Sequence, residues 1–98
     1  KNFKISGLGA STKGNVLLQL AKIDNQKLDR IYDVNKEKFG KFTPITKIKI
    51  IDERKIKKFK QDYILLLIWH FKKFVINKIK KNNKKTKIII PFPKIRII

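Results

Sequence analysis

Residues 62–69, DYILLLIW, restrict the fold of this chain more than any other segment. Their consecutive apolar side chains would cover both faces of an extended segment. A strand of that kind is typical of the centre of a parallel sheet that has helices above and below it. The apolar run is also far shorter than the roughly 20 residues that cross a bilayer. The segment therefore predicts an α/β fold without a membrane-spanning part.

Other strands are predicted on both sides of this segment along the chain. They fall at residues 3–6, 29–33, 45–51 and 87–93, and residues 94–98 form either a sixth short strand or an extended tail. Residues 45–51 alternate Ile with Thr and Lys in part, as a half-exposed edge strand does. Asp33 is expected at the carboxyl end of the second strand.

Three helices are predicted between the strands. The first is capped by Ser11 or Thr12, and the three-and-four spacing of its apolar residues predicts a buried face made of Val16, Leu17, Leu20 and Ala21. The second is short, is capped by Asp52 and runs through Phe59, with Ile56 and Phe59 facing inward. The third covers residues 70–81, and its apolar side consists of Phe71, Phe74, Val75 and Ile79.

This order of elements predicts a small Rossmann-like α/β domain. Right-handed crossovers fold it most simply into an open parallel sheet in the order 3-2-1-4-5, with helices on both faces. With 98 residues the chain is long enough to form one domain, residues 1–98, around its own core.

Composition narrows the setting and the chemistry. The chain has no cysteine, which excludes disulfides and thiolate zinc sites and is compatible with the reducing cytoplasm. It starts at Lys1 rather than Met, so we expect a C-terminal fragment of a larger protein. The net charge of +19 permits nucleic-acid binding, but only Arg30, Arg54 and Arg96 among the 26 basic residues are arginine. A lysine-rich solvated surface is the commoner cause of such a charge, so nucleic acid is an unfavoured partner.

Candidate binding residues gather at one edge of the expected sheet. Ligands of such folds bind outside the carboxyl ends of the strands, where the strand order reverses. The residues expected there are Gly7, Gly9, Ala10, Ser11, Lys13, Asn15, Asp33, Trp69 and His70. No catalytic constellation is evident among them, and one histidine without cysteine cannot build a metal site.

The glycine-rich residues 7–15, GLGASTKGN, match two phosphate-binding motifs only in part. Thr12 stands where a dinucleotide motif has its third glycine, although Asp33 follows at about the right distance. Two interpretations stay open: the start of the helix holds an anionic ligand, or the glycines only allow a tight turn. Similarly, Asp33 binds a sugar hydroxyl or caps the loop at Asn35. Trp69 stacks on a ring or closes the core, and His70 is catalytic or lies at the surface.

Several stretches together resemble the C-terminal domain of sugar C-methyltransferases, which use S-adenosylmethionine on nucleotide-linked keto-sugars. The stretches are GLGASTKGNVLLQL, IYDVNKEKFGKFTPITKIKI, DYILLLIWHFKKFVINKI and IIIPFPKIRII, in this order and covering nearly the whole chain. Their most specific parts are the 7–15 turn and the loop from Gly40 to Pro44.

The resemblance implies that other domains of the same polypeptide hold zinc, S-adenosylmethionine and the general base. In such an enzyme the base removes a proton alpha to the ketone, and the enolate attacks the donor methyl. This chain would hold no cofactor itself, would be silent alone, and would shape the sugar-nucleotide cleft with its 7–15 turn and with Trp69 and His70. A nucleotide-binding or NAD(P)-binding module of a sugar-modifying enzyme is the alternative, and Thr12 counts against it.

Overall fold

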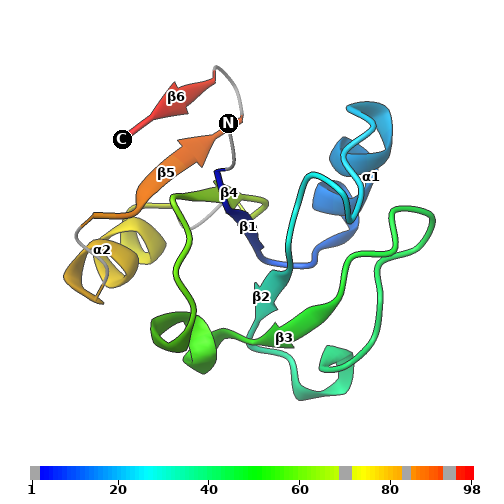
Figure 1. The fold of residues 1–98 in the computed structure, drawn as a ribbon, viewed down its shortest axis with the longest axis horizontal. Coiled ribbons are helices and arrows are strands. Elements are labelled where there is room, and N and C mark those ends of the chain that lie inside the picture. The colour runs from blue at the N-terminus through cyan, green and yellow to red at the C-terminus, as the bar shows by residue number, and fades with distance from the viewer. Residues whose placement is uncertain (1–2, 69–71, 83–84, 92–94) are drawn as a thin grey trace.

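A six-stranded sheet organises the chain (Figure 1). The computed structural model describes residues 3–68, 72–82, 85–91 and 95–98. Its strands are β1 (Ile5–Leu8), β2 (Ile31–Asp33), β3 (Ile50–Asp52), β4 (Tyr63–Leu66), β5 (Lys87–Ile90) and β6 (Arg96–Ile97). The α-helices are α1 (Thr12–Leu20) and α2 (Lys72–Asn82), and two 3-10 helices, η1 (Lys36–Lys38) and η2 (Glu53–Lys58), follow β2 and β3.

The strand order is β3-β2-β1-β4-β5-β6. Strands β1 to β5 are parallel neighbours in the predicted order, which leaves the switch point between β1 and β4. The predicted sheet was nevertheless incomplete, because β6 adds an antiparallel strand to β5, with Ile89 opposite Ile97. The sheet is therefore mixed. Arg96 and Ile97 form a strand because they pair with the edge that β5 leaves open.

Strand β4 confirms the prediction of a centre buried on both faces. Alternate residues of an extended strand point to opposite faces, and Ile64 and Leu66 pack in one apolar cluster while Leu65 and Leu67 pack in the other. Ile56 of η2 and Ile79 of α2 belong to the first cluster. Leu18 of α1 belongs to the second. The predicted cover of helices on both faces is not shown, because η2 is a 3-10 helix and residues outside the helices, such as Leu28 and Ile48, contribute to the second cluster.

The predicted buried face of α1 is wrong. Leu18 is fully buried, whereas Leu20 is 79% exposed and Val16 is 50% exposed. Ala21 is also exposed, and Leu17 is only partly buried. Gly14 gives the physical reason: a Cβ there would lie 2.9 Å from Leu67 Cβ, so α1 approaches the sheet along the Gly14 and Leu18 side.

Two other predicted features differ from the structure. The edge strand is only Ile50–Asp52, because Ile45 and Lys47 have left-handed φ values of 67° and 59° that interrupt extension. Asp52 does cap the next helix, accepting the Arg54 N–H at 2.9 Å. Phe59, expected inside, is 37% exposed, and the Arg30 guanidinium stacks 3.8 Å from its ring centroid.

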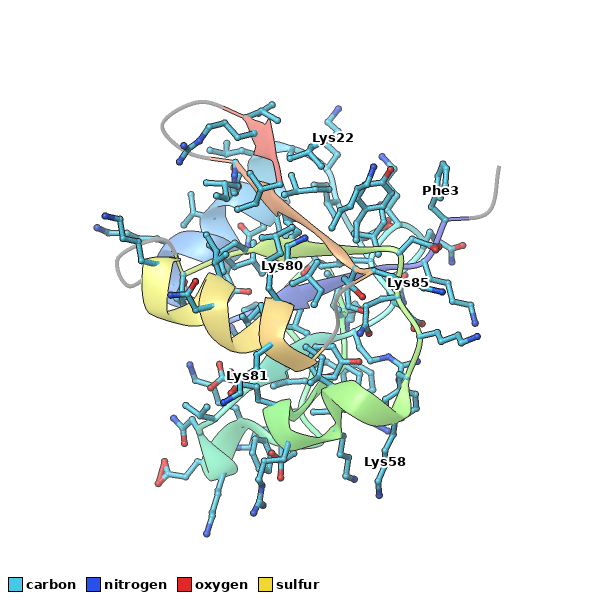
Figure 2. All side chains as sticks on the ribbon, turned by 90° about the vertical axis from the view of Figure 1, so that its left-hand side faces the viewer. Phe3, Lys22, Lys58, Lys80, Lys81 and Lys85 are labelled. Atoms are coloured by element: carbon cyan, nitrogen blue, oxygen red, sulfur yellow. The ribbon has the colours of Figure 1, made fainter. Side chains whose placement is uncertain are left out.

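Ile79, one of the four residues predicted on the apolar side of the third helix, is buried in α2. Phe71 and the side chains of Phe74 and Val75 lie outside the described residues. No helix in the described part of the chain has the length and hydropathy needed to cross a membrane. Lysine side chains such as Lys22 and Lys58 project outward from the ribbon (Figure 2).

Candidate functional site

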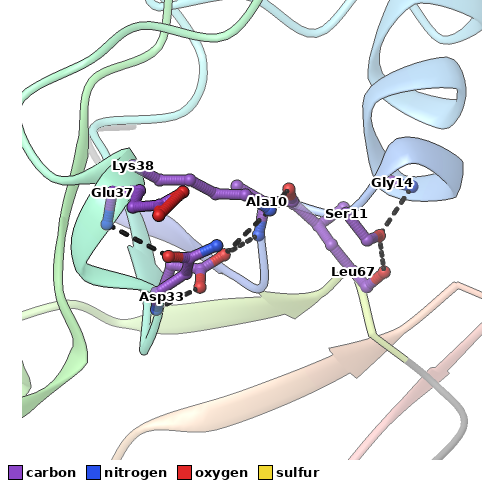
Figure 3. Close-up of polar contacts among 8 residues, drawn as sticks. Ala10, Ser11, Gly14, Asp33, Glu37, Lys38 and Leu67 are labelled. Atoms are coloured by element: carbon purple, nitrogen blue, oxygen red, sulfur yellow. Dashed lines mark hydrogen bonds and ion pairs between the residues drawn. The ribbon is translucent and has the colours of Figure 1, made fainter.

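The side chain of Asp33 joins the turn after β1 to the loop after β2 (Figure 3). Its Oδ2 accepts the Ala10 N–H at 2.8 Å, and its Oδ1 accepts the Asn35 N–H at 2.8 Å. The residue is buried. Of the two interpretations that the sequence left open, the structure contains the cap at Asn35, and the carboxylate also holds the glycine turn in place.

Ser11 fixes the start of α1 against the end of β4. Its backbone is extended, and its Oγ accepts the Gly14 N–H at 3.0 Å and donates to the Leu67 carbonyl at 3.1 Å (Figure 3). Ser11 is therefore the cap and Thr12 is the first helical residue. The hydroxyl satisfies one helix N–H and one buried carbonyl at the same time.

The glycines of the turn are explained by packing and backbone conformation. Gly9 has φ +93°, and a Cβ there would lie 2.4 Å from Ile68 Cγ2. The Gly9 N–H donates to the Tyr32 carbonyl at 2.7 Å. Ile68 thus occupies the space through which a phosphate group would approach Gly9, and the N–H that would bind it is already used.

The sequence predicts Gly7 in the 7–15 turn. In the structure Gly7 lies inside β1 instead. A Cβ at Gly7 would meet Ile31, Leu28 and Leu67 side chains at 3.1 Å each. The absence of a side chain at this position allows the second apolar cluster to close over β1. Gly7 is therefore a packing residue and stands apart from the site.

Lys38 is a site residue that sequence reasoning missed. Its Nζ donates to the Ala10 carbonyl at 2.8 Å and lies 3.9 Å from Asp33 Oδ2 (Figure 3). Ala10 is thus held through its N–H by Asp33 and through its carbonyl by Lys38. The only signal in the sequence is the position of Lys38 shortly after the second strand, and the abundance of lysine conceals it.

A hollow of about 240 Å³ opens beside these contacts. Its lining residues are Gly9, Ser11, Tyr32, Asp33, Val34, Lys38, Glu53 and Ile68. Three of the predicted site residues, Gly9, Ser11 and Asp33, are thus brought together, and Ala10 adjoins them through its hydrogen bonds. Sequence reasoning missed the lining residues contributed by the β2–η1 loop and by η2.

The remaining predicted residues do not line the hollow. Lys13 is exposed on α1. Asn15 is partly buried, and its Oδ1 has no hydrogen-bond partner among the described residues. Trp69 and His70 lie outside the described residues, so their predicted roles stay predictions.

Carboxylates concentrate around this edge of the sheet. Four of the seven acidic residues of the chain lie here: Asp33, Glu37, Asp52 and Glu53. Asp33 and Asp52 occupy paired positions on β2 and β3. The Arg54 guanidinium and N–H, hydrogen-bonded to Asp52, lower the pKa of that carboxyl, so it stays ionised. In the described part of the chain, no three carboxylate or histidine side chains are grouped so as to hold a metal ion.

The fold and the site define an α/β domain with a hollow beside the switch point of its sheet. Residues 1–93 match the family model of the C-methyltransferase C-terminal domain, and the chain belongs to this family. The resemblance based on the 7–15 turn and the later stretches is therefore confirmed. No curated protein matches the chain significantly.

Proposed function

We propose that this domain forms one wall of the substrate cleft of an S-adenosylmethionine-dependent C-methyltransferase. The substrate is a nucleotide-linked keto-sugar or a similar small molecule, and the domain is silent alone. The observation that carries the proposal is the hollow at the carboxyl ends of β1 and β2, the edge at which such sheets bind ligands. Membership of a C-methyltransferase family supports the reaction class.

The residues of this chain do not fit the phosphates of a nucleotide cofactor at Gly9. A dinucleotide motif offers free N–H groups of the glycine turn to the pyrophosphate, but the Gly9 N–H already donates to the Tyr32 carbonyl. A phosphate would need to approach Gly9, where Ile68 lies. NAD(P) binding at the turn loses support on this ground, and our proposal assigns the methyl donor to another part of the enzyme.

C-methylation needs a methyl donor, a base and a cleft that binds the substrate. A base would remove the proton alpha to the ketone, and the new bond from this carbon to the donor methyl group would form as the bond from the methyl group to the donor sulfur breaks. We assign Asp33 a structural role rather than that of the base, because its two oxygens hold the Ala10 and Asn35 N–H groups in place. The share proposed for this domain is to bind and orient the sugar.

Two measurements test the proposal on the purified chain. Incubation with radiolabelled S-adenosylmethionine and a keto-sugar nucleotide is expected to transfer no methyl group, and turnover would overturn the silent role. In ¹⁵N-labelled protein, UDP-glucose and dTDP-glucose are expected to shift the amide resonances of Gly9, Ala10 and Val34. The Gly40 and Lys85 amides serve as the reference. Unchanged spectra with millimolar amounts of both compounds would overturn the cleft role.

A further inference from the structure

We infer that the hollow beside Asp33 takes the neutral, hydroxyl-bearing sugar ring of the substrate and that the diphosphate lies outside it. This inference rests on the proposed function and adds to it which part of the substrate occupies the site. Three observations support it: the carboxylates in the lining, the hydrogen bonds that N–H groups of the turn already make, and the small volume of the hollow.

The lining is rich in carboxylates for so basic a chain. Asp33 and Glu53 contribute two carboxylates, and Lys38 contributes one ammonium group. The whole chain, by contrast, has 26 basic and 7 acidic residues. A diphosphate entering this hollow would lie beside two carboxylates, and like charges repel.

Three backbone donors of the glycine-rich turn are already used. The N–H groups of Gly9, Ala10 and Gly14 donate to the Tyr32 carbonyl, to Asp33 Oδ2 and to Ser11 Oγ. Ile68 fills the space next to Gly9. A phosphate in the hollow would therefore find no free N–H at Gly9 or Ala10.

The same lining suits hydroxyl groups. A hydroxyl donates to a carboxylate and accepts from an ammonium group, and each carboxylate oxygen can accept a second hydrogen bond. The Lys38 Nζ has three protons, one of which is donated to the Ala10 carbonyl. Val34, which is largely exposed, and the partly buried Ile68 offer apolar surface to the C–H face of a ring.

The size of the hollow favours a single ring. Its volume of about 240 Å³ lies below the range of roughly 300–1,000 Å³ that is usual for drug-sized ligands. A complete nucleotide sugar would extend well beyond it. The diphosphate and base would then lie outside, where the basic surface of the chain or another domain can meet them.

The test compares UDP-glucose with UDP in wild-type protein and in Glu53→Gln, which keeps the shape of the side chain and removes its charge. If the ring occupies the hollow, the variant weakens UDP-glucose binding about tenfold, because a hydrogen bond to a charged acceptor is replaced by a weaker one to a neutral amide, and leaves UDP binding unchanged. Amide shifts at Val34 and Lys38 should then appear with UDP-glucose but not with UDP. Glu37→Gln, on the exposed η1, is the matched control and should change neither affinity.

Two outcomes would overturn the inference while the proposed function survives. The first is tighter binding of both compounds to Glu53→Gln, which would place the diphosphate in the hollow. The second is UDP-glucose binding with shifts at the start of α1 but none at Val34 or Lys38. If UDP-glucose and dTDP-glucose bind nowhere on the chain, the proposed function fails and the inference fails with it.

Discussion

The Asp33 carboxylate and the Ala10 N–H form a 2.8 Å hydrogen bond that ties the end of β2 to the turn after β1. The two residues are 23 positions apart in the sequence, and both are buried. A second bond, from the Asn35 N–H, uses the other oxygen of Asp33. The shape of the hollow therefore depends on this carboxylate in the protein without ligand.

Replacing Asp33 with alanine is expected to lower the free energy of unfolding by about 2 kcal/mol, because a buried N–H loses its acceptor. Urea denaturation measures the change. Asp24→Ala is the control, since Asp24 also accepts an N–H two residues later, from Gln26, but in an exposed turn. Equal losses in the two variants would show that burial of the Ala10 contact contributes little.

Alanine substitutions at Gly9 and Gly40 distinguish the energetic cost of steric overlap from the cost of backbone strain. Both have left-handed φ values, +93° and +80°, but a Cβ at Gly40 would meet nothing within 4 Å. Gly40→Ala should therefore cost about 1 kcal/mol of unfolding free energy. Gly9→Ala should cost about 3 kcal/mol, since overpacking against Ile68 is added to the strain. Thermal or urea unfolding of both variants measures the difference, and similar costs would contradict the tight contact with Ile68.

Leu18 and Leu20 test the orientation of α1. Leu18→Ala should lower the free energy of unfolding by about 3 kcal/mol, because Leu18 is fully buried in the second apolar cluster. Leu20→Ala should change it by less than about 0.5 kcal/mol, because Leu20 is largely exposed. Urea denaturation of the two variants provides the comparison. The reverse order of losses would restore the face that periodicity alone predicts.

The sequence predicted features set by local pattern and failed where a distant contact decides. The apolar run of β4 needs cover on both faces wherever it lies, so its central position could be inferred. Residues 16–18 and 20 are all apolar, however, and several faces of α1 could be buried. The choice depends on the close approach of Gly14 to Leu67, which no periodicity in α1 encodes.

In the candidate site, too, the sequence predicted what a local pattern sets and missed what distant contacts decide. Asp33 was identified because a carboxylate at the end of a second strand is unusual, and its position is confirmed. Its partner Ala10 is bound through the backbone, which the sequence does not distinguish from any other N–H. Lys38 resembles every other lysine of the chain until the fold places it on the Ala10 carbonyl. Site residues that act through their backbone, or that belong to a residue type abundant in the chain, could thus not be predicted from the sequence.

Tyr32 gives the chain a predictable response to alkaline pH. Burial raises the pKa of its phenol, whose hydroxyl donates to Gln61 Oε1 at 2.8 Å. A pKa that is higher in the folded than in the unfolded state means that stability is complete below pH 10 and falls as the pH rises toward the folded pKa. The fall is about 1.4 kcal/mol per pH unit.

Absorbance at 295 nm in Tyr63→Phe, which leaves Tyr32 as the single tyrosine of the chain, should give a higher ionisation midpoint in the folded chain than in urea. Tyr32→Phe is the control for stability, because it removes the phenol and should lack the part of the alkaline fall that this group causes. Identical midpoints in folded and unfolded protein would contradict the burial of Tyr32. They would also contradict the packing of β2 beneath the hollow, since the same side chain belongs to the first apolar cluster.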